Sequence, residues 1–397
     1  MITRMHELGT PLAGIRAGFV DGSFAVRAGV CVSGLPRSVP EKKVATHTDT
    51  SLPDLFRFRD GAAVQRAEEW PRRRLELLDA ILPLEYGGLP PAPHATRSEE
   101  LHTSVVRHLD GARTITCRVV AEFDRPFAFI LYLLVPPGPG PFPVVLNGDA
   151  CWGYVTDEIT AEVLRRGNIL AQFNRVEIAA DVRDAGRDSG LYPLFPEDTF
   201  GALAAWAWGY HRCVDALAGF DFVDRTRIAV VGHSRGGKAS LLAGATDERI
   251  ALTAANDSGC CGAGCYRFQG PNSETLADIV GRFPYWFGPD FGDTIGREAE
   301  LPFDQHFLKA AVAPRLLLTT EALGDLWANP TGAWRTHEAA RQVYRFLGVA
   351  ERIGIWYREG GHAHSPADWE TLLDFMDWHF RGQPPVRDFA ANPFGPT

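Results

Sequence analysis

The fold of this chain is decided by one stretch, Val230-Val231-Gly232-His233-Ser234-Arg235-Gly236-Gly237-Lys238. An apolar run at 227–231 has the character of a buried strand, and a helix-forming run of small residues follows at 238–245. Gly-x-Ser-x-Gly between a strand and a helix predicts a nucleophile elbow, a tight turn that lifts a serine hydroxyl out of the chain. Glycines on both sides of the serine remove Cβ clashes in such a turn. We therefore predict Ser234 as the nucleophile of an acyl transfer.

The rest of the sequence places a regular order of strands and helices around this turn. Three strand-like runs separated by turn residues come first and suit an antiparallel meander. After the Pro- and Gly-rich segment 136–141, strands alternate with helices in the pattern of parallel βαβ units. Together they predict an α/β fold, a three-layer αβα sandwich of the α/β-hydrolase type with a mostly parallel central sheet. The expected strands are 101–108, 112–123, 127–135, 144–146, 169–173, 227–231, 250–254, 315–319 and 353–357, and the expected helices lie at about 75–82, 157–166, 199–217 and 366–380.

The length suits one large domain with insertions. We expect a single catalytic domain over residues 51–397, preceded by an N-terminal extension, residues 1–50, that is poorly ordered or packed on the core. Charged residues interrupt every apolar segment of that extension, so no ordinary secretory signal is visible. The sequence as written predicts a cytoplasmic protein, with export only if the true start differs, and localisation stays open.

The composition excludes several classes of partner. Of the 397 residues, 45% are hydrophobic and 22% are charged, as in globular proteins. No run of about 18 uncharged apolar residues is present to span a bilayer, so we expect a soluble protein without a membrane partner. The net charge of −9 argues against a nucleic-acid partner. The arginine run 72–74 is expected to form one solvated face of a helix.

The seven cysteines do not predict a metal site. Cys260, Cys261 and Cys265 cluster, but no Cys-x-x-Cys pair or nearby His-x-His set completes a zinc site. We therefore predict that the protein needs neither a metal nor another cofactor.

A serine nucleophile of this fold needs an acid and a histidine, in the chain order serine, acid, histidine. Two histidines, His362 and His364, stand in a Gly-rich segment after the last expected strand, and an imidazole suits the transfer of the serine proton. Two carboxylates compete to orient it. Asp257 follows the strand after the elbow, and Asp325 follows the next strand. Spacing alone chooses neither the histidine nor the acid.

Several short segments together form a more specific pattern than the elbow alone. They are residues 232–238, Asp257-Ser258-Gly259, Ser273-Glu274-Thr275, Asp325-Leu326-Trp327 and Gly361-His362-Ala363-His364. Together they resemble the glucuronoyl esterases of carbohydrate esterase family 15. The resemblance covers about residues 142–380, and its Gly-x-Ser-Arg-x-Gly-Lys element is far more specific than a bare elbow.

The resemblance implies a role for each matched residue. Ser234 falls on the family's nucleophile, and Arg235 falls on an arginine that helps to stabilise the oxyanion. Lys238 and Glu274 fall on residues that contact the sugar, and Trp327 falls on a tryptophan whose flat face suits a sugar ring.

The base and the acid also follow from the resemblance. The family's histidine, in its fungal His-x-His pattern, falls on His364, which we prefer to the first histidine of the segment. The family's acid occurs at either of two positions, here Asp257 or Asp325. Because Asp257 is one methylene shorter than the family's glutamate, the orienting role shifts towards Asp325. Fungal members carry a disulfide whose positions are here His233 and Ser365, so a bacterial-type member is expected.

These residues predict a serine-type carboxylic ester hydrolase that cleaves 4-O-methyl-glucuronoyl esters, such as lignin–carbohydrate ester links, through an acyl-enzyme on Ser234. The alternative is an acetyl xylan esterase or another carbohydrate or aryl esterase, because the triad serves any acyl transfer. A binding module without catalysis is disfavoured because serine, histidine and acid candidates are all present. The expected partner is a small-molecule or polysaccharide-linked uronate ester, bound by a monomer.

Overall fold

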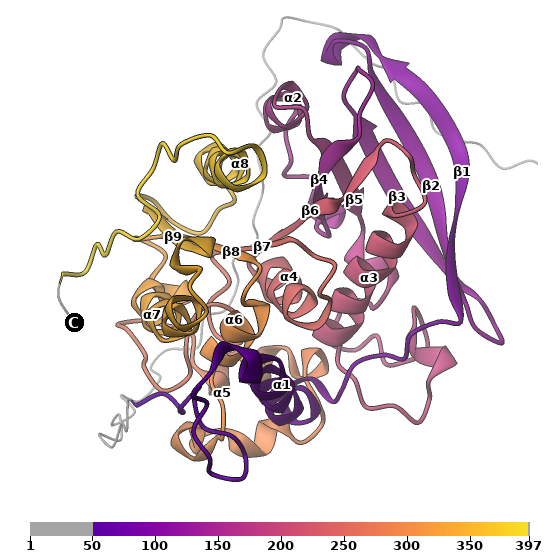
Figure 1. Ribbon diagram of the computed structural model, residues 1–397. Coiled ribbons are helices and arrows are strands. Elements are labelled where there is room, and N and C mark those ends of the chain that lie inside the picture. Colours follow the sequence, from indigo (N-terminus) through magenta and orange to yellow (C-terminus); the bar gives the residue numbers. More distant parts are fainter. Residues whose placement is uncertain (1–50, 396–397) are drawn as a thin grey trace, which may run out of the picture. The chain divides into compact units, whose positions relative to one another are not determined.

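The computed structural model describes residues 51–395, which are organised around one mixed sheet (Figure 1). The strands are β1 (Ala95–Val106), β2 (Ala112–Glu122), β3 (Phe127–Val135), β4 (Phe142–Asn147), β5 (Ile169–Phe173), β6 (Val223–His233), β7 (Leu252–Asn256), β8 (Leu316–Ala322) and β9 (Ile353–Arg358). Their order is β1-β2-β3-β5-β4-β6-β7-β8-β9. The pairs from β1 to β5 are antiparallel, and those from β5 to β9 are parallel. The expected N-terminal extension, residues 1–50, lies outside the described residues.

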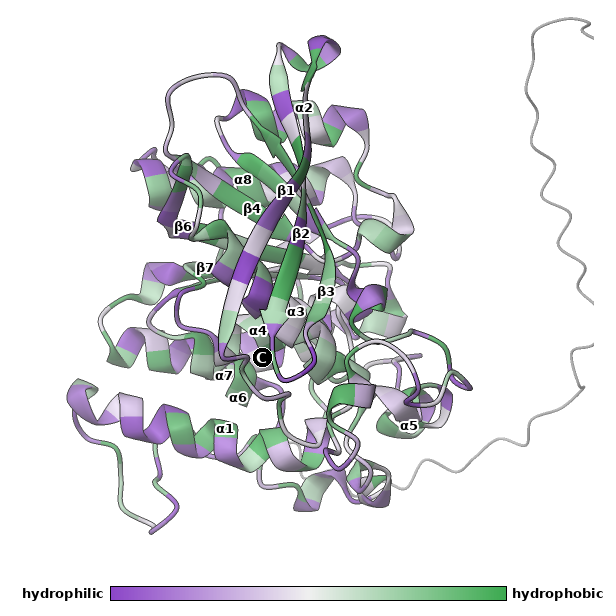
Figure 2. Cartoon of the chain, turned by 90° about the vertical axis from the view of Figure 1, so that its right-hand side faces the viewer, coloured by the Kyte–Doolittle hydropathy of each residue, from purple (hydrophilic) through white to green (hydrophobic). Residues whose placement is uncertain are grey.

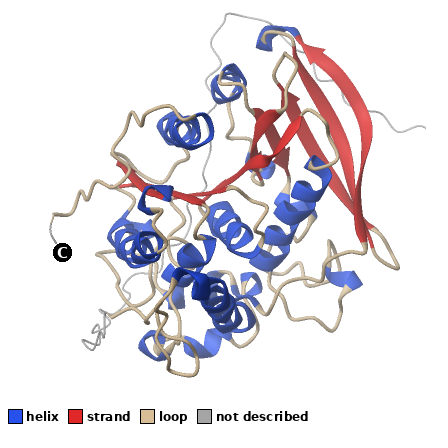
Figure 3. Ribbon diagram, in the orientation of Figure 1, coloured by secondary structure: helices blue, strands red, loops and turns tan. Residues whose placement is uncertain are grey.

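Helices cover both faces of the sheet and give three layers (Figure 3). They are α1 (Trp70–Tyr86), α2 (Asp157–Arg165), α3 (Ala202–Leu217), α4 (Arg235–Thr246), α5 (Leu276–Arg282), α6 (His306–Val312), α7 (Pro330–Phe346) and α8 (Pro366–Arg381). α2 and α8 pack on one face, where Ile159 and Leu372 join the same buried cluster. α3 and α4 pack on the other face through Leu203 and Leu241, and α1, α6 and α7 extend that layer. Among the described residues, no helix is both long enough and apolar enough to cross a membrane.

The hydrophobic pattern of the strands explains these layers. In β4, Val144 and Leu146 join one buried cluster, and Val145 between them joins the other. Both faces of the parallel strands are therefore buried, as their continuous apolar runs predict. β1 is polar along much of its length (Figure 2) and mostly exposed. That composition suits its place at the edge of the sheet.

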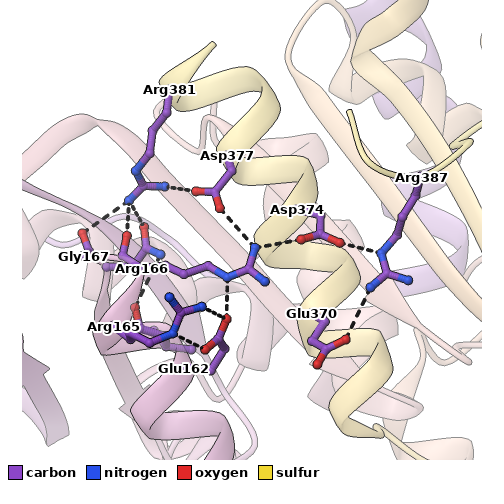
Figure 4. Close-up of polar contacts among 11 residues, drawn as sticks. Glu162, Arg165, Arg166, Gly167, Glu370, Asp374, Asp377, Arg381 and Arg387 are labelled. Carbon is purple, nitrogen blue, oxygen red and sulfur yellow. Dashed lines mark hydrogen bonds and ion pairs between the residues drawn. The ribbon is translucent and has the colours of Figure 1, made fainter. Parts of the chain in front are cut away.

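α8 begins directly after the segment that carries both histidines, the histidine loop (residues 359–364), and ion pairs fix α8 to the end of α2 (Figure 4). Arg166 donates to Asp374 (2.7 Å) and Asp377 (3.0 Å). Arg381 donates to Asp377 (2.6 Å) and to the carbonyl of Arg166 (2.7 Å). At the other end, Ser365 caps α8 through its side chain. The end of the histidine loop is therefore anchored to a fixed helix.

The structure confirms the predicted three-layer fold, and all nine expected strands are present. The bounds differ where polar residues continue a strand: β1 begins at Ala95 rather than at 101, and β6 begins at Val223 rather than at 227. Helices α5, α6 and α7 lie outside the expected elements. Two of them, α5 and α6, are only 7 residues long, too short for a clear helical period.

The arginine run in α1 is not the solvated face that its charge predicts. Arg73 and Arg74 are buried. Arg74 donates to the carbonyls of Ala245 and Ala311, each at 2.7 Å, near the C-terminal ends of α4 and α6. Helix ends leave carbonyls without intrahelical partners, and this guanidinium satisfies two of them. The prediction is wrong because two of the three arginines serve packing, and only Arg72 stays exposed.

The elbow lies where the strand order of the sheet reverses. The chain leaves β4 for β5 on one side and then crosses to β6 on the other side of β4. At such a reversal, the carboxyl ends of neighbouring parallel strands leave a crevice where α/β proteins bind ligands. Asn147 ends β4 and His233 ends β6, so Ser234 follows the carboxyl end of β6 at this reversal.

Candidate active site

Ser234 occupies the turn between β6 and α4 in the strained conformation of a nucleophile elbow. Its φ and ψ are 55° and −121°, a conformation that costs a non-glycine residue about 1–3 kcal/mol. Close packing requires the neighbouring glycines. A Cβ on Gly232 would lie 2.2 Å from the carbonyl oxygen of Gly236, and a Cβ on Gly236 would lie 2.1 Å from a carboxylate oxygen of Asp149. The serine is partly exposed, so a substrate can reach it.

A buried ion pair supports the elbow. Asp149 accepts hydrogen bonds from the backbone N–H of His233 (2.9 Å) and from the hydroxyl of Tyr154 (2.6 Å). The same carboxylate pairs with Arg175, and both side chains are fully buried. Removing one partner of a buried pair costs about 3–5 kcal/mol. The elbow is therefore locked to the end of β4.

His362 and Asp325 form a hydrogen-bonded pair beside the elbow. Nδ1 of His362 lies 2.6 Å from Oδ2 of Asp325. The acid is 5% exposed and the imidazole 44% exposed. The His362 ring centroid is 4.5 Å from that of His233, the residue before the nucleophile. A carboxylate at Nδ1 keeps the proton there and leaves Nε2 free to accept another, which is what a general base needs.

His364, the histidine preferred from the resemblance, has other surroundings. Its ring stacks on Trp369 with centroids 4.8 Å apart, and its Nδ1 lies 3.2 Å from the hydroxyl of Tyr154. Burial lowers its pKa well below the ordinary value. Among the described residues, no carboxylate is a hydrogen-bond partner of this ring. The geometry therefore favours His362 as the base, because the ring of His364 is built into the core, and the choice between the two histidines stays a prediction.

The two candidate acids differ in their partners. Polar atoms of Asp257, Asp325 and His362 all lie within 4.8 Å of one another. Asp257, however, accepts from the backbone N–H of Ala322 (2.7 Å) and from Arg358 (2.9 Å). Burial raises the pKa of the Asp257 carboxyl to about 7, against the opposing hydrogen bond from Ala322. Of the two acids that the sequence leaves open, Asp325 is the one hydrogen-bonded to His362.

The same three side chains are close enough together to hold a metal ion. Both oxygens of Asp257 and Nδ1 of His362 already have hydrogen-bond partners within the protein. An acid–base arrangement accounts for the cluster, and the absence of a metal requirement stays a prediction.

Arg235, the first residue of α4, is held among aromatic rings. Its guanidinium donates to Asp181 (2.9 Å) and lies 4.8 Å from the ring centroid of Trp286 and 5.7 Å from that of Trp152. The hydroxyl of Tyr285 donates to Asp181 (2.9 Å) and fixes it in turn. Nε of Arg235 is buried without a hydrogen-bond partner in the described part of the chain. The Arg235 side chain as a whole is 28% exposed, so the outer N–H groups of its guanidinium can meet a substrate oxygen.

The structure also brings together Lys238, Glu274 and Trp327. Nζ of Lys238 is buried, donates to the carbonyls of Ser258 and Cys260, and lies 3.9 Å from the Glu274 carboxylate. The backbone N–H of Glu274 donates to the carbonyl of Trp327 (3.0 Å), whose side chain is among the exposed hydrophobic ones. Burial raises the pKa of Glu274. These three side chains place an ammonium, a carboxylate and an exposed aromatic ring in one region.

Sequence patterns do not single out three residues that contact this site, Asp149, Arg175 and Arg358. Asp149 and Arg175 follow β4 and β5, and they meet only because these strands are neighbours in the sheet. Each of the three lies at or just beyond the carboxyl end of a parallel strand. That position is the one signal that could have found them, because ligand sites of α/β sheets lie there.

Known proteins resemble this chain in sequence. A family model described as fungal glucuronyl esterase matches residues 120–348. A 4-O-methyl-glucuronoyl methylesterase of Hypocrea jecorina (strain QM6a) is 31% identical over 383 residues, which are 92% of this chain and 77% of the relative.

Solved structures of glucuronoyl esterases are also similar to this chain. A carbohydrate esterase family 15 glucuronoyl esterase from Caldicellulosiruptor kristjansonii has a TM-score of 0.77 and 33% identity, over 88% of this chain and 96% of that one. A mutant glucuronoyl esterase from Sporotrichum thermophile, in complex with methyl 4-O-methyl-beta-D-glucopyranuronate, has a TM-score of 0.71 and 27% identity, over 86% and 91% of the two chains. This chain therefore belongs to the glucuronoyl esterase family, carbohydrate esterase family 15.

Proposed function

We propose that this chain is a serine-type carboxylic ester hydrolase that cleaves esters of 4-O-methyl-glucuronic acid or a related uronate. The observation that carries the proposal is the hydrogen bond between His362 and Asp325 beside the strained Ser234 elbow, in a member of the glucuronoyl esterase family. One relative is named a 4-O-methyl-glucuronoyl methylesterase, and one solved neighbour holds a uronate methyl ester. Both support the same substrate class.

Acylation starts at Ser234. Its oxygen forms a bond to the ester carbonyl carbon while its proton passes to Nε2 of His362. The Asp325 carboxylate keeps Nδ1 protonated and stabilises the resulting imidazolium. Collapse of the tetrahedral intermediate breaks the bond to the alcohol oxygen, which takes the proton from His362. Water, deprotonated by the same histidine, then releases the uronate from the serine.

The negative charge on the former carbonyl oxygen needs donors that are already in place. The first backbone N–H groups of α4 have no intrahelical acceptor and come directly after the nucleophile. We assign Arg235 to the same task, because it follows Ser234 directly in the chain, its side chain is 28% exposed and Asp181 holds its guanidinium. Loss of one such donor typically lowers kcat by about 10²–10³.

Lys238, Glu274 and Trp327 are proposed to bind the sugar. An ammonium and a carboxylate 3.9 Å apart offer a donor and an acceptor to neighbouring hydroxyls. The exposed face of Trp327 offers an apolar surface to the C–H groups of a pyranose ring. An acetyl group has neither hydroxyls nor a ring, so this group favours a uronate ester over an acetyl ester.

Two finer assignments belong to the proposal. His233 and Ser365 stand where the fungal pattern carries its disulfide, which supports a bacterial-type member. We also propose that the enzyme acts as a monomer.

A pair of substrates separates this function from its alternative, an acetyl or aryl esterase. We would measure kcat/KM on benzyl glucuronate and on p-nitrophenyl acetate, with Ser234→Ala as the control. The proposal expects a preference for the uronate ester and loss of both activities in the control. Efficient acetate turnover without uronate turnover would reject the uronate assignment.

A further inference from the structure

We propose that Arg358 is a positioning residue for the base: its guanidinium ties the histidine loop to Asp257, so that His362 meets Asp325. The inference rests on the proposed function for its substrate, while the geometry is independent of it. Arg358 is the last residue of β9, and its side chain is only 10% exposed. It is therefore anchored in the sheet rather than in the loop it contacts.

Arg358 contacts the histidine loop on both sides of the base. Its Nη1 donates to the carbonyl of Gly361 (3.0 Å) and its Nη2 to the carbonyl of Ala363, the two residues that flank His362. Gly360 takes a φ of 102°, and glycines restrict the backbone least. A loop of this composition needs an external constraint to hold an imidazole in one place. Arg358 supplies that constraint from a buried strand end.

Two buried carboxylates hold the guanidinium itself. Nη2 donates to Asp257 (2.9 Å), and Nε donates to Asp368 of α8 (2.7 Å). Both acidic side chains are fully buried. A planar guanidinium with five donors can serve these two carboxylates and three carbonyls of the histidine loop at once, whereas the three donors of a lysine ammonium cannot.

These contacts also determine which acid orients the base. Asp257 and Asp325 are both close to the one imidazole of His362. Arg358 and a backbone N–H are the hydrogen-bond partners of the two oxygens of Asp257, whereas Nδ1 of His362 is bonded to Asp325. Asp257 therefore acts through Arg358, as the anchor of the loop rather than as the partner of the base.

The test compares Arg358→Gln and Arg358→Lys with the unmodified enzyme in two assays. The first gives kcat and KM on benzyl glucuronate. The second gives the rate at which a fluorophosphonate probe labels Ser234, which depends on the base but needs no sugar. We expect kcat and the labelling rate to fall together, on the order of 10- to 100-fold for Arg358→Gln, with KM within about twofold. Arg358→Lys recovers only part of the loss.

The matched control is Arg249→Gln, which also removes a guanidinium bonded to two carboxylates, those of Asp247 and Asp215. It lies outside the site, and both rates should stay unchanged. Thermal melting followed by circular dichroism shows that each variant is folded. A folded Arg358→Gln with unchanged kcat and labelling rate overturns the proposal, and so does a rise in KM alone.

Asp257→Asn keeps the test decisive if Arg358→Gln does not fold. We expect Asp257→Asn to lower kcat and the labelling rate much less than Asp325→Asn does. Equal losses would make Asp257 a direct partner of the base and overturn the inference. If the enzyme labels rapidly but does not cleave the uronate ester, the proposed function fails, and the labelling rates of the variants alone decide the role of Arg358.

Discussion

Two histidines of one loop, His362 and His364, have opposite surroundings. The His362 ring is 44% exposed and bonded to a carboxylate, whereas the His364 ring is buried against Trp369 and bonded to Tyr154. The surroundings of His362 suit the exchange of protons with a substrate. His364 belongs, through Tyr154, to the buried network beneath the elbow. We therefore expect exposure and hydrogen-bond partner, rather than position along the loop, to determine which histidine is the base.

Replacing each histidine by alanine gives the largest expected effect. His362→Ala should lower kcat on a uronate ester by about 10⁴ or more, because the serine loses its base. His364→Ala should leave most of kcat but lower the free energy of unfolding by about 2 kcal/mol or more, because it opens a cavity in the core. Steady-state kinetics and urea unfolding measure the two quantities. The reverse pattern would restore His364 as the base.

The acids should differ in the same way. Asp325→Asn should lower kcat by about 10³–10⁴, because the histidine loses the partner that fixes its tautomer. Asp257→Asn should cost about tenfold, because its effect passes through Arg358. Rates on one uronate ester, with circular dichroism to check folding, measure the contrast. Small and equal losses in the two variants would contradict the assignment of Asp325.

The buried support beneath the elbow should matter mainly for stability. Asp149→Asn leaves Arg175 buried without its charge partner and should lower the free energy of unfolding by about 3–5 kcal/mol. Urea unfolding measures it. Glu300→Gln is the control, because it breaks an ion pair with Arg297 whose side chains are both more than 60% exposed, and stability should not change. Equal stability of both variants would mean that the buried pair does not hold the elbow.

Low pH should lower the stability of the folded protein through its buried histidines. Burial lowers the pKa of His364 well below its ordinary value and that of His233 to about 4. Below about pH 6.5 the unfolded chain therefore binds protons that the folded chain does not, so stability falls as pH drops from there towards about 4. Melting temperatures between about pH 7.5 and 4.5 measure this slope. His364→Phe should make the slope shallower by about the share of one proton, because burial also lowers the pKa of His211, His306 and His337. An unchanged slope would contradict burial of the His364 ring.

The smallest expected effect concerns sugar binding. Trp327→Ala should raise KM for the uronate ester about three- to tenfold with little change in kcat, because it removes contacts made before and during reaction. Turnover of p-nitrophenyl acetate should stay the same. A loss on both substrates would show that Trp327 supports the catalytic residues rather than the sugar.

Much of the fold could be predicted from sequence because its signals are local. Apolar runs bounded by turn residues indicate all nine strands, and Gly-x-Ser-x-Gly after a buried strand indicates the elbow. The burial of Arg73 and Arg74 could not be predicted, because their partners are backbone carbonyls outside α1. Arg73 donates to those of Asp54 and Leu55, and Arg74 donates to carbonyls of α4 and α6, far along the chain. Charge alone predicts solvation for such residues.

The sequence could predict which residues form the site, but not which of them are hydrogen-bonded to one another. Ser234, two acids and two histidines stand at the expected points of the chain. The choice between His362 and His364 depends on which ring the loop turns towards Asp325, and a two-residue offset carries no information about that. The role of Arg358 depends on carbonyls and carboxylates that only the folded chain brings together.

The pairing of the base is tested most directly by proton NMR of the resting enzyme. An imidazole Nδ1 proton held by a carboxylate gives a resonance at unusually low field. We predict that this resonance is present in the unmodified enzyme, persists in His364→Gln and disappears in Asp325→Asn. A resonance that persists in Asp325→Asn and disappears in His364→Gln would contradict the assignment of His362 as the base.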